Sequence, residues 1–182
     1  SGFLGGKFDI IVQRFVDAFL AFPGLLVLLT VLSIVGPGLL QIIFVLGILT
    51  GIHSSRIVRS SVIGIKENDY FLSAKAIGSP TPRTVMRHIM PNIMAPLIII
   101  FSISIGGIIL DEASLSFLGF GLPPEVPSWG GMLSWEGRRY MELKPELALY
   151  PGLCLALVIF GVNVFGDAVR DLLDPRLRGG ER

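Results

Sequence analysis

Long apolar segments constrain the fold of this chain more than any other feature. A segment that crosses the hydrocarbon core of a bilayer needs about 20 mainly apolar residues in helical form, because no water is present there to satisfy free backbone groups. Four segments fulfil this condition, over residues 10–35, 39–58, 93–110 and 147–165. The sequence therefore predicts an all-α, polytopic membrane protein in which residues 1–182 form a single transmembrane domain with four spans.

The composition agrees with this class. Hydrophobic residues make up 52% of the chain and charged residues only 16%, whereas soluble domains contain about 25% charged residues. A soluble globular protein is therefore excluded, and the net charge of +1 gives no basis for a nucleic-acid partner. Cys154 is the single cysteine and lies in an apolar segment, where we expect a buried and unreactive thiol.

Proline and small residues modify two of the spans. Pro23-Gly24 lies inside the first span and predicts a kink there. The third span contains Pro96 and several small residues, which allow helices to approach closely. These small residues are Ser102, Ser104, Gly106 and Gly107. We therefore expect the third span to lie at helix–helix contacts and not to face lipid.

Basic residues indicate the orientation of the spans. Twelve of the 15 Lys and Arg residues lie toward the chain ends and in the segment between the second and third spans. The other three are Arg138, Arg139 and Lys144. Cytoplasmic segments of membrane proteins are enriched in Lys and Arg. The charge distribution therefore predicts that both termini and the loop 59–92 are cytoplasmic, and that the loop 111–146 is extracytoplasmic.

The loop 111–146 begins with two carboxylates, Asp111 and Glu112, at the outer end of the third span. Acidic residues at a membrane are candidates for a functional role. Two interpretations stay open for this pair: a structural ion pair with Arg138 or Arg139, or a contact in the transport pathway with a cation or a peptide amine. The loop also carries aromatic residues suited to a membrane interface, namely Trp129, Trp135 and Tyr140.

The loop 59–92 contains the pattern of two short helices. Asn68 or Asp69 is a suitable N-cap for a helix over 70–77, and Gly78 follows where a left-handed C-terminal stop is expected. A turn then leads to a second helix that continues to about residue 90, with Thr81 as its cap and Pro82 in its first turn.

The first of these helices has an apolar side. Tyr70, Ala74 and Ile77 share one face at helical spacing, and Phe71 flanks them. Such a face in a solvated loop has to pack on something. The residues alone leave two interpretations open, packing on the chain's own spans or packing on a partner protein.

The segment 72–91 resembles the cytoplasmic signature loop of permeases of ABC importers. That signature is Glu-Ala-Ala, three residues, Gly, nine residues and then Ile-x-Leu-Pro. The residues at matching positions are Ser73, Ala74, Gly78 and Pro91. The positions that depart from it are Leu72, His88 and Met90, where the family has Glu, Ile and Leu. Because Leu72 replaces an acid, we expect the contact made here to depend on apolar burial.

Three further stretches are similar to one branch of these permeases, the second permease subunit of dipeptide, oligopeptide and nickel importers. The first is Asp-Ala-Phe-Leu-Ala-Phe-Pro at 17–23. The second is Glu-Ala-Ser-Leu-Ser-Phe-Leu-Gly-Phe-Gly at 112–121, with Pro-Ser-Trp-Gly-Gly-Met-Leu at 127–133. The third runs from Gly166-Asp167 to Asp174-Pro175-Arg176. The resemblance implies spans upstream of Ser1, so we expect this sequence to be a fragment.

The resemblance implies a type I permease fold in the inner membrane of a prokaryote. It implies a subunit that forms half of a translocation pathway for dipeptides or oligopeptides, with nickel as the alternative substrate. The implied partners are a homologous second permease subunit, two cytoplasmic ABC ATPase subunits, an extracytoplasmic substrate-binding protein and the lipid bilayer.

The resemblance also assigns the contact with the ATPases to the loop 59–92. The residues expected there are Tyr70, Phe71, Leu72, Ser73, Ala74, Lys75, Gly78, Arg83 and Pro91. The sequence contains no Gly-x-x-x-x-Gly-Lys-Ser/Thr loop, so ATP would be bound by the partner subunits and not by this chain. We therefore expect no cofactor in this chain and no catalytic centre.

Other functions fit the sequence less well. Ser102 and Ser104 invite comparison with an intramembrane serine protease, but neither lies in a Gly-x-Ser-x-Gly setting and no His falls in an apolar span beside them. His53 and His88 lack the spacing of metal ligands, so we expect no metal site. A channel-like pore would conduct without ATP, which distinguishes it from a permease subunit.

Overall fold

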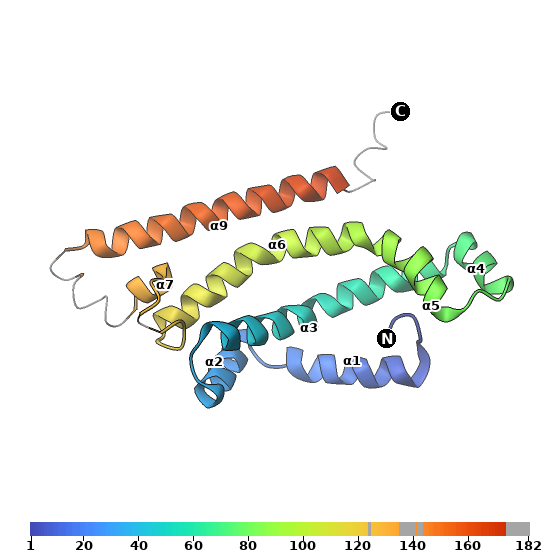
Figure 1. Ribbon diagram of the computed structural model, residues 1–182, viewed down its shortest axis with the longest axis horizontal. Helices are drawn as coiled ribbons and strands as arrows, with labels where there is room; N and C mark the ends of the chain where they lie inside the picture. Colours follow the sequence, from blue (N-terminus) through green and yellow to red (C-terminus); the bar gives the residue numbers. More distant parts are fainter. Residues whose placement is uncertain (124, 135–140, 142–143, 174–182) are drawn as a thin grey trace. The chain divides into compact units, whose positions relative to one another are not determined.

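The computed structural model describes residues 1–123, 125–134, 141 and 144–173, with the backbone alone at Lys75 (Figure 1). All secondary-structure elements in these described residues are helices, as the sequence predicts. The helices are α1 (Gly6–Leu20), α2 (Gly24–Val35), α3 (Leu39–Lys66), α4 (Asp69–Ala76), α5 (Thr81–Thr84), the π-helical turn η1 (Val85–Ile89), α6 (Met90–Phe117), α7 (Trp129–Met132) and α9 (Glu146–Leu173).

Among the described residues, three helical segments are long and apolar enough to cross a membrane. They are α3, the continuous segment Thr81–Phe117 that comprises α5, η1 and α6, and α9. Helices α1 and α2 pass the same test only as a pair that is bent at the break between them. The predicted span 10–35 is therefore broken, not merely kinked. Pro23 has no N–H to donate and takes an extended conformation (φ −57°, ψ 125°) in front of α2.

The helices extend beyond the apolar segments that predicted them. Helix α3 continues to Lys66, past the predicted end at residue 58, and α9 continues to Leu173, past residue 165. Helix α6 runs to Phe117, so Asp111 and Glu112 lie inside a helix and not in a loop that begins at residue 111. Hydropathy identifies the part of a helix that can lie in the hydrocarbon core of a membrane. The backbone hydrogen bonds that extend a helix do not depend on the hydropathy of its side chains.

Helix α6 ends at a glycine that the sequence analysis did not single out. Gly119 has a φ of +85°, in the left-handed region that glycine adopts most easily. The Phe120 N–H donates to the Leu115 carbonyl at 2.9 Å, and the Gly119 N–H donates to the Ser116 carbonyl at 3.1 Å. This pair of bonds is a Schellman motif, which satisfies the last carbonyls of the helix.

The chain divides into two compact units, which are described separately. The first comprises residues 1–21, 52–101 and the segment from 169, and the second comprises residues 22–51 and 102–168. Helices α3 and α6 contribute residues to both units. The core of the second unit consists of Leu28, Leu32, Ile42, Leu46 and Leu115.

In the first unit, α1 is attached to α3 by charged side chains. Arg59 donates from Nε to Asp9 Oδ1 at 2.8 Å and from Nη2 to Oδ2 at 2.5 Å, and Asp9 is buried. Arg56 donates to Asp17 at 2.5 Å. Lys66 Nζ donates to the Phe3 carbonyl at 3.0 Å. Two of the basic residues that indicate orientation therefore also hold α1 against α3, and Lys66 holds the segment that precedes α1.

In the second unit, α6 and α9 approach closely at two glycines. A Cβ at Gly106 of α6 would collide with Oδ1 of Asn163 on α9. A Cβ at Gly166 of α9 would lie 3.3 Å from the carbonyl carbon of Ser102 on α6, and the Ser102 side chain is buried. The expectation that the third span lies at helix–helix contacts is confirmed at these positions.

We predict that Gly106→Leu lowers the stability of the permease, whereas Gly107→Leu does not. The added side chain at Gly106 has to displace Asn163, and overpacking of this kind costs about 1–3 kcal/mol. Gly107 is the matched control, because no heavy atom lies within 4 Å of a Cβ built there. Thermal unfolding of the two purified variants in detergent measures the difference. Equal unfolding midpoints would contradict the close approach of α6 and α9.

Candidate functional site

Helix α4 is closed by Gly78 in the way the sequence predicts. It begins at Asp69, and the carbonyl of the preceding residue, Asn68, accepts hydrogen bonds from the N–H groups of Phe71 (3.0 Å) and Leu72 (3.2 Å). Gly78 has a φ of +71°, and the Ser79 N–H donates to the Ala74 carbonyl at 3.1 Å. The left-handed stop expected at Gly78 is therefore confirmed.

The inner side of α4 packs on the chain itself. Phe71 is only 6% exposed and lies in the core of the first unit with Val62 and Ile65 of α3, Ile89 of η1 and Ile93 of α6. Its ring also meets that of Phe3 edge-on, with centroids 6.2 Å apart. Ala74 is buried as well. Of the two interpretations left open for this helix, packing on the chain's own helices therefore holds for Phe71.

The outer side of α4 carries the other apolar residues. Tyr70 is 41% exposed, Leu72 52% and Ile77 84%. Of the three residues predicted to share one apolar face, only Ala74 is buried, whereas Tyr70 and Ile77 are exposed. Ser73 is also exposed, and the side chain of Lys75 lies outside the described residues. The chain thus leaves Leu72 on α4 and Ile77, the residue that follows α4, exposed, while Tyr70 is partly exposed.

A second helical segment follows α4 after a short turn. Pro80 caps α5 and Thr81 is its first residue, so the expected cap at Thr81 is wrong by one position, while Pro82 lies in the first turn as predicted. Arg83 is exposed on this turn. The ring of His88 in η1 lies 6.2 Å from the ring of Tyr70, so aromatic side chains link the two segments.

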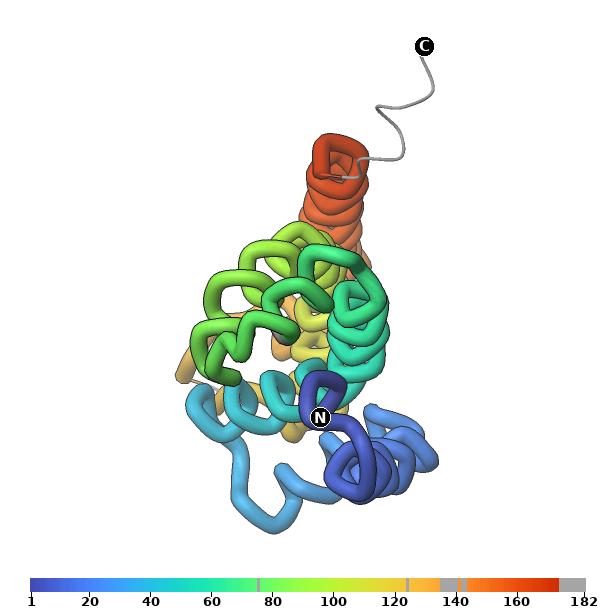
Figure 2. The backbone as a smooth tube through the Cα atoms, turned by 90° about the vertical axis from the view of Figure 1, so that its right-hand side faces the viewer, coloured from blue at the N-terminus to red at the C-terminus, as the bar shows by residue number. Residues whose placement is uncertain are grey.

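The helix that starts at Thr81 does not end near residue 90. Figures 1 and 2 show α5, η1 and α6 as one uninterrupted coil, with Pro91 in the first turn of α6. A proline inside an α-helix clashes with the carbonyl four residues earlier and cannot donate to it. The π-helical turn just before Pro91 changes the hydrogen-bond register at that point, and Asn92 Nδ2 donates to the His88 carbonyl at 2.6 Å.

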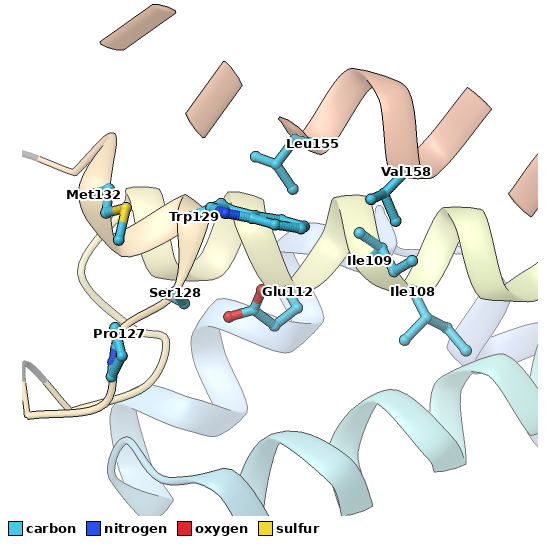
Figure 3. Close-up of a pocket in the computed structure, with 9 residues that line it drawn as sticks. All are labelled: Ile108, Ile109, Glu112, Pro127, Ser128, Trp129, Met132, Leu155 and Val158. Atoms are coloured by element: carbon cyan, nitrogen blue, oxygen red, sulfur yellow. The ribbon is translucent and has the colours of Figure 1, made fainter. Parts of the chain in front are cut away.

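The second site is a pocket in the second unit, between α6, α7 and α9. Its volume is about 570 Å³, within the range of small-molecule pockets. Glu112 and Trp129 line it, whereas Asp111 does not appear among the described lining residues. Figure 3 shows the Glu112 side chain reaching from α6 toward the space beside the indole of Trp129. Glu112 accepts a hydrogen bond from Ser116 Oγ at 2.6 Å.

The position of Trp129 follows from its neighbours in the sequence. Ser128 caps α7, because its Oγ accepts a hydrogen bond from the Gly131 N–H at 3.1 Å. Gly130 is buried, and a Cβ there would lie 2.5 Å from the carbonyl oxygen of Ala113 on α6. Only glycine permits this approach, which brings α7 onto α6. The sequence analysis placed Trp129 at a membrane interface and missed the pocket, although the adjacent Gly130-Gly131 pair was a usable signal.

Several expected residues fall elsewhere. Cys154 is exposed on α9, so the expectation of a buried thiol is wrong. The predicted interface residues Trp135 and Tyr140, and the ion-pair candidates Arg138 and Arg139, lie outside the described residues. Within the described part of the chain, no three His, Cys, Asp or Glu side chains lie together in a way that could hold a metal ion.

Comparison with known proteins decides the family. The model of the family described as "Binding-protein-dependent transport system inner membrane component" matches residues 1–179. The chain belongs to this family. The resemblance that rests on the loop 59–92 and the three further stretches is therefore confirmed, as is the all-helical permease fold.

Named permeases are similar to this chain over nearly its whole length. The dipeptide transport system permease protein DppC of Alkalihalophilus pseudofirmus is 36% identical over 178 residues, which are 98% of this chain and 58% of that permease. The glutathione transport system permease protein GsiD of Shigella flexneri is 35% identical over 174 residues, which are 96% of this chain and 57% of that permease. GsiD of Escherichia coli O157:H7 gives the same values. The chain thus spans less than two thirds of the permeases it matches.

We predict that Gly78→Val destabilises the α4 turn and that Gly78→Asn does so less. A left-handed conformation costs an L-residue about 1–2 kcal/mol, least for Asn and most for a β-branched side chain. Limited proteolysis of the loop 59–92 in the two purified variants measures the effect, with faster cleavage expected for Gly78→Val. Equal cleavage of both variants and of the unchanged protein would contradict the left-handed role of Gly78.

Proposed function

We propose that this chain is part of a permease subunit of an ABC importer for small peptides, forming half of the translocation pathway. The observation that carries the proposal is the two-sided α4, in a chain of the binding-protein-dependent transport family. Phe71 packs its inner side on α3 and α6, while Leu72 and Ile77 remain exposed on its outer side. In this proposal the chain is not an enzyme and binds no cofactor, and ATP is bound by partner subunits.

The contact with the ATPases is assigned to the outer side of α4 and to the turn that follows. Tyr70, Leu72 and Ile77 offer apolar surface, and Arg83 on α5 adds a positive charge next to it. Because Phe71 packs against residues of α3 and α6, a displacement of α4 by an ATPase would be passed to two of the apolar helices. In this proposal the buried side chain of Phe71 transmits the movement of α4 to α3 and α6. Gly78 ends α4, and Pro91 lies at the start of α6.

The other partners follow from the same assignment. A homologous permease subunit would complete the pathway, and exposed apolar residues of α9, such as Leu157 and Phe160, are available for it or for lipid. A binding protein would deliver substrate on the side opposite to α4. This arrangement places the loop 59–92 and the termini in the cytoplasm, the loop 111–146 outside, and the whole chain in the inner membrane of a prokaryote.

Peptides are the proposed substrate class. The named relatives are permeases for a dipeptide and for glutathione, which is itself a small peptide. Neither name supports nickel, the alternative raised by the sequence, and none of the comparisons points to a protease. Ser102, the serine considered for a protease, instead lies where α6 meets Gly166 of α9.

Uptake by reconstituted vesicles tests this function. The full-length permease, with its partner permease, ATPases and binding protein, should accumulate a labelled dipeptide only when ATP is supplied to the ATPases, and should not accumulate labelled nickel. A complex whose ATPase cannot hydrolyse ATP is the control. Dipeptide flux that continues in this control would indicate a channel-like pore, and ATP-dependent uptake of nickel alone would overturn the peptide assignment.

The assignment of α4 predicts separate effects for its two sides. Leu72→Ala and Ile77→Ala should each weaken binding of the ATPase about tenfold and leave the unfolding midpoint of the permease unchanged, since burial of a large side chain contributes about 1.5–3 kcal/mol. Phe71→Ala should lower that midpoint, because a buried Phe is lost. Ile57→Ala, at an exposed residue of α3, is the control and should change neither. Normal ATPase binding by the Leu72 and Ile77 variants would remove the assignment.

Thiol labelling tests the orientation. In a Cys154→Ala background, a cysteine at Ser128 should react with a membrane-impermeant reagent in intact cells, whereas one at Ser79 should react only after the membrane is opened. Both positions are half-buried in the chain, so their accessibility is comparable. Labelling of the Ser79 variant alone in intact cells would reverse the proposed orientation.

A further inference from the structure

The pocket of the second unit has a distinctive chemistry. Of the described residues that line it, Glu112 is the only charged one. The walls on α6 and α9 are aliphatic and include Ile108, Ile109, Leu155 and Val158. A carboxylate beside apolar walls has lost part of its hydration, and a cation that enters the pocket restores the lost interaction. The pocket therefore favours a ligand with one positive charge and an apolar body.

Trp129 adds a second feature that favours a cation. The face of an indole ring carries negative potential and attracts ammonium groups, most strongly among the aromatic side chains. Figure 3 shows this ring projecting from α7 across the pocket, with Leu155 and Glu112 on opposite sides of it. The Ser128 cap and the close approach of Gly130 to Ala113 place the backbone of α7 beside α6, and this brings Trp129 to the pocket.

We propose that this pocket binds the protonated amino terminus of a small peptide, with Glu112 pairing the ammonium group and the Trp129 ring facing it. The inference rests on the proposed function and adds a ligand-recognising site in the permease itself. At neutral pH a free peptide amino terminus is largely protonated, since its pKa is about 8. The aliphatic walls then receive an apolar side chain of the peptide. Acetylation of the amine removes the charge that Glu112 recognises.

Peptide binding to the assembled transporter in lipid nanodiscs, without the binding protein, measures this property directly. The probes are the labelled dipeptide Ala-Phe and its N-acetyl derivative. The unchanged transporter should bind Ala-Phe at least about tenfold more tightly than the acetylated peptide, as expected for a hydrogen bond to a charged group. Glu112→Gln should abolish this preference and change the affinity for the acetylated peptide less than twofold.

Three further variants separate recognition from folding. Trp129→Leu should weaken Ala-Phe binding about threefold to tenfold, while Trp129→Phe should retain most of the affinity because it keeps an aromatic face. Glu125→Gln removes an exposed carboxylate from the same connecting segment and should bind both peptides like the unchanged protein.

The outcomes distinguish this inference from the function on which it rests. Equal binding of the two peptides by the unchanged transporter, or an equal loss of both in Glu112→Gln, would overturn the amine site and leave Glu112 with a structural role. Vesicles that still accumulate dipeptide with ATP would show that the proposed function survives such a result. Failure of that uptake would instead overturn the function, whatever the nanodiscs bind.

Discussion

The need to hydrogen-bond every backbone group in an apolar environment governs this structure. It explains why each long apolar segment is helical, and why the backbone is compensated locally at Pro91 and at Gly119. At Pro91 the remedy is a π-helical turn, together with the Asn92 side chain that donates to the His88 carbonyl. At Gly119 it is a pair of backbone bonds that close α6. Pro91 and Gly119 thus lie where the helix changes register and where it ends, whereas Pro96 and Pro151 lie inside α6 and α9.

Two different kinds of contact organise the two units. In the first unit, charged pairs attach α1 to α3, and the aromatic ring of Phe71 joins α4 to α3 and α6. In the second unit, glycines matter more, because Gly130 and Gly166 lie against the backbone of α6 and Gly106 leaves room for the Asn163 side chain. The proposed ATPase contact therefore depends on a packed core beneath an exposed helix, while the proposed amine site depends on glycines that hold α7 on α6.

The sequence predicted the features that depend on local chemistry. The apolar segments, the stop at Gly78 and the position of an irregularity at Pro23 were predictable, although a kink was expected there and not a break, because each is set by a few adjacent residues. The helix ends were misplaced, since α3, α6 and α9 continue through polar residues that a hydropathy argument cuts off. The inward direction of Phe71 and the pocket beside Trp129 were not predicted, although the Gly130-Gly131 pair was a signal for the pocket. Both depend on contacts with residues distant in the sequence.

The π-helical turn also has a geometric consequence. Val85, Ile89, Ile93 and Leu97 all face the core of the first unit at intervals of four residues. In a regular α-helix such a row drifts around the axis by about 40° at each step, so its two ends would point in different directions. The wider π turn rotates the chain less per residue and offsets this drift. The π turn therefore keeps this row of residues on the side of the core in which Phe71 of α4 is buried.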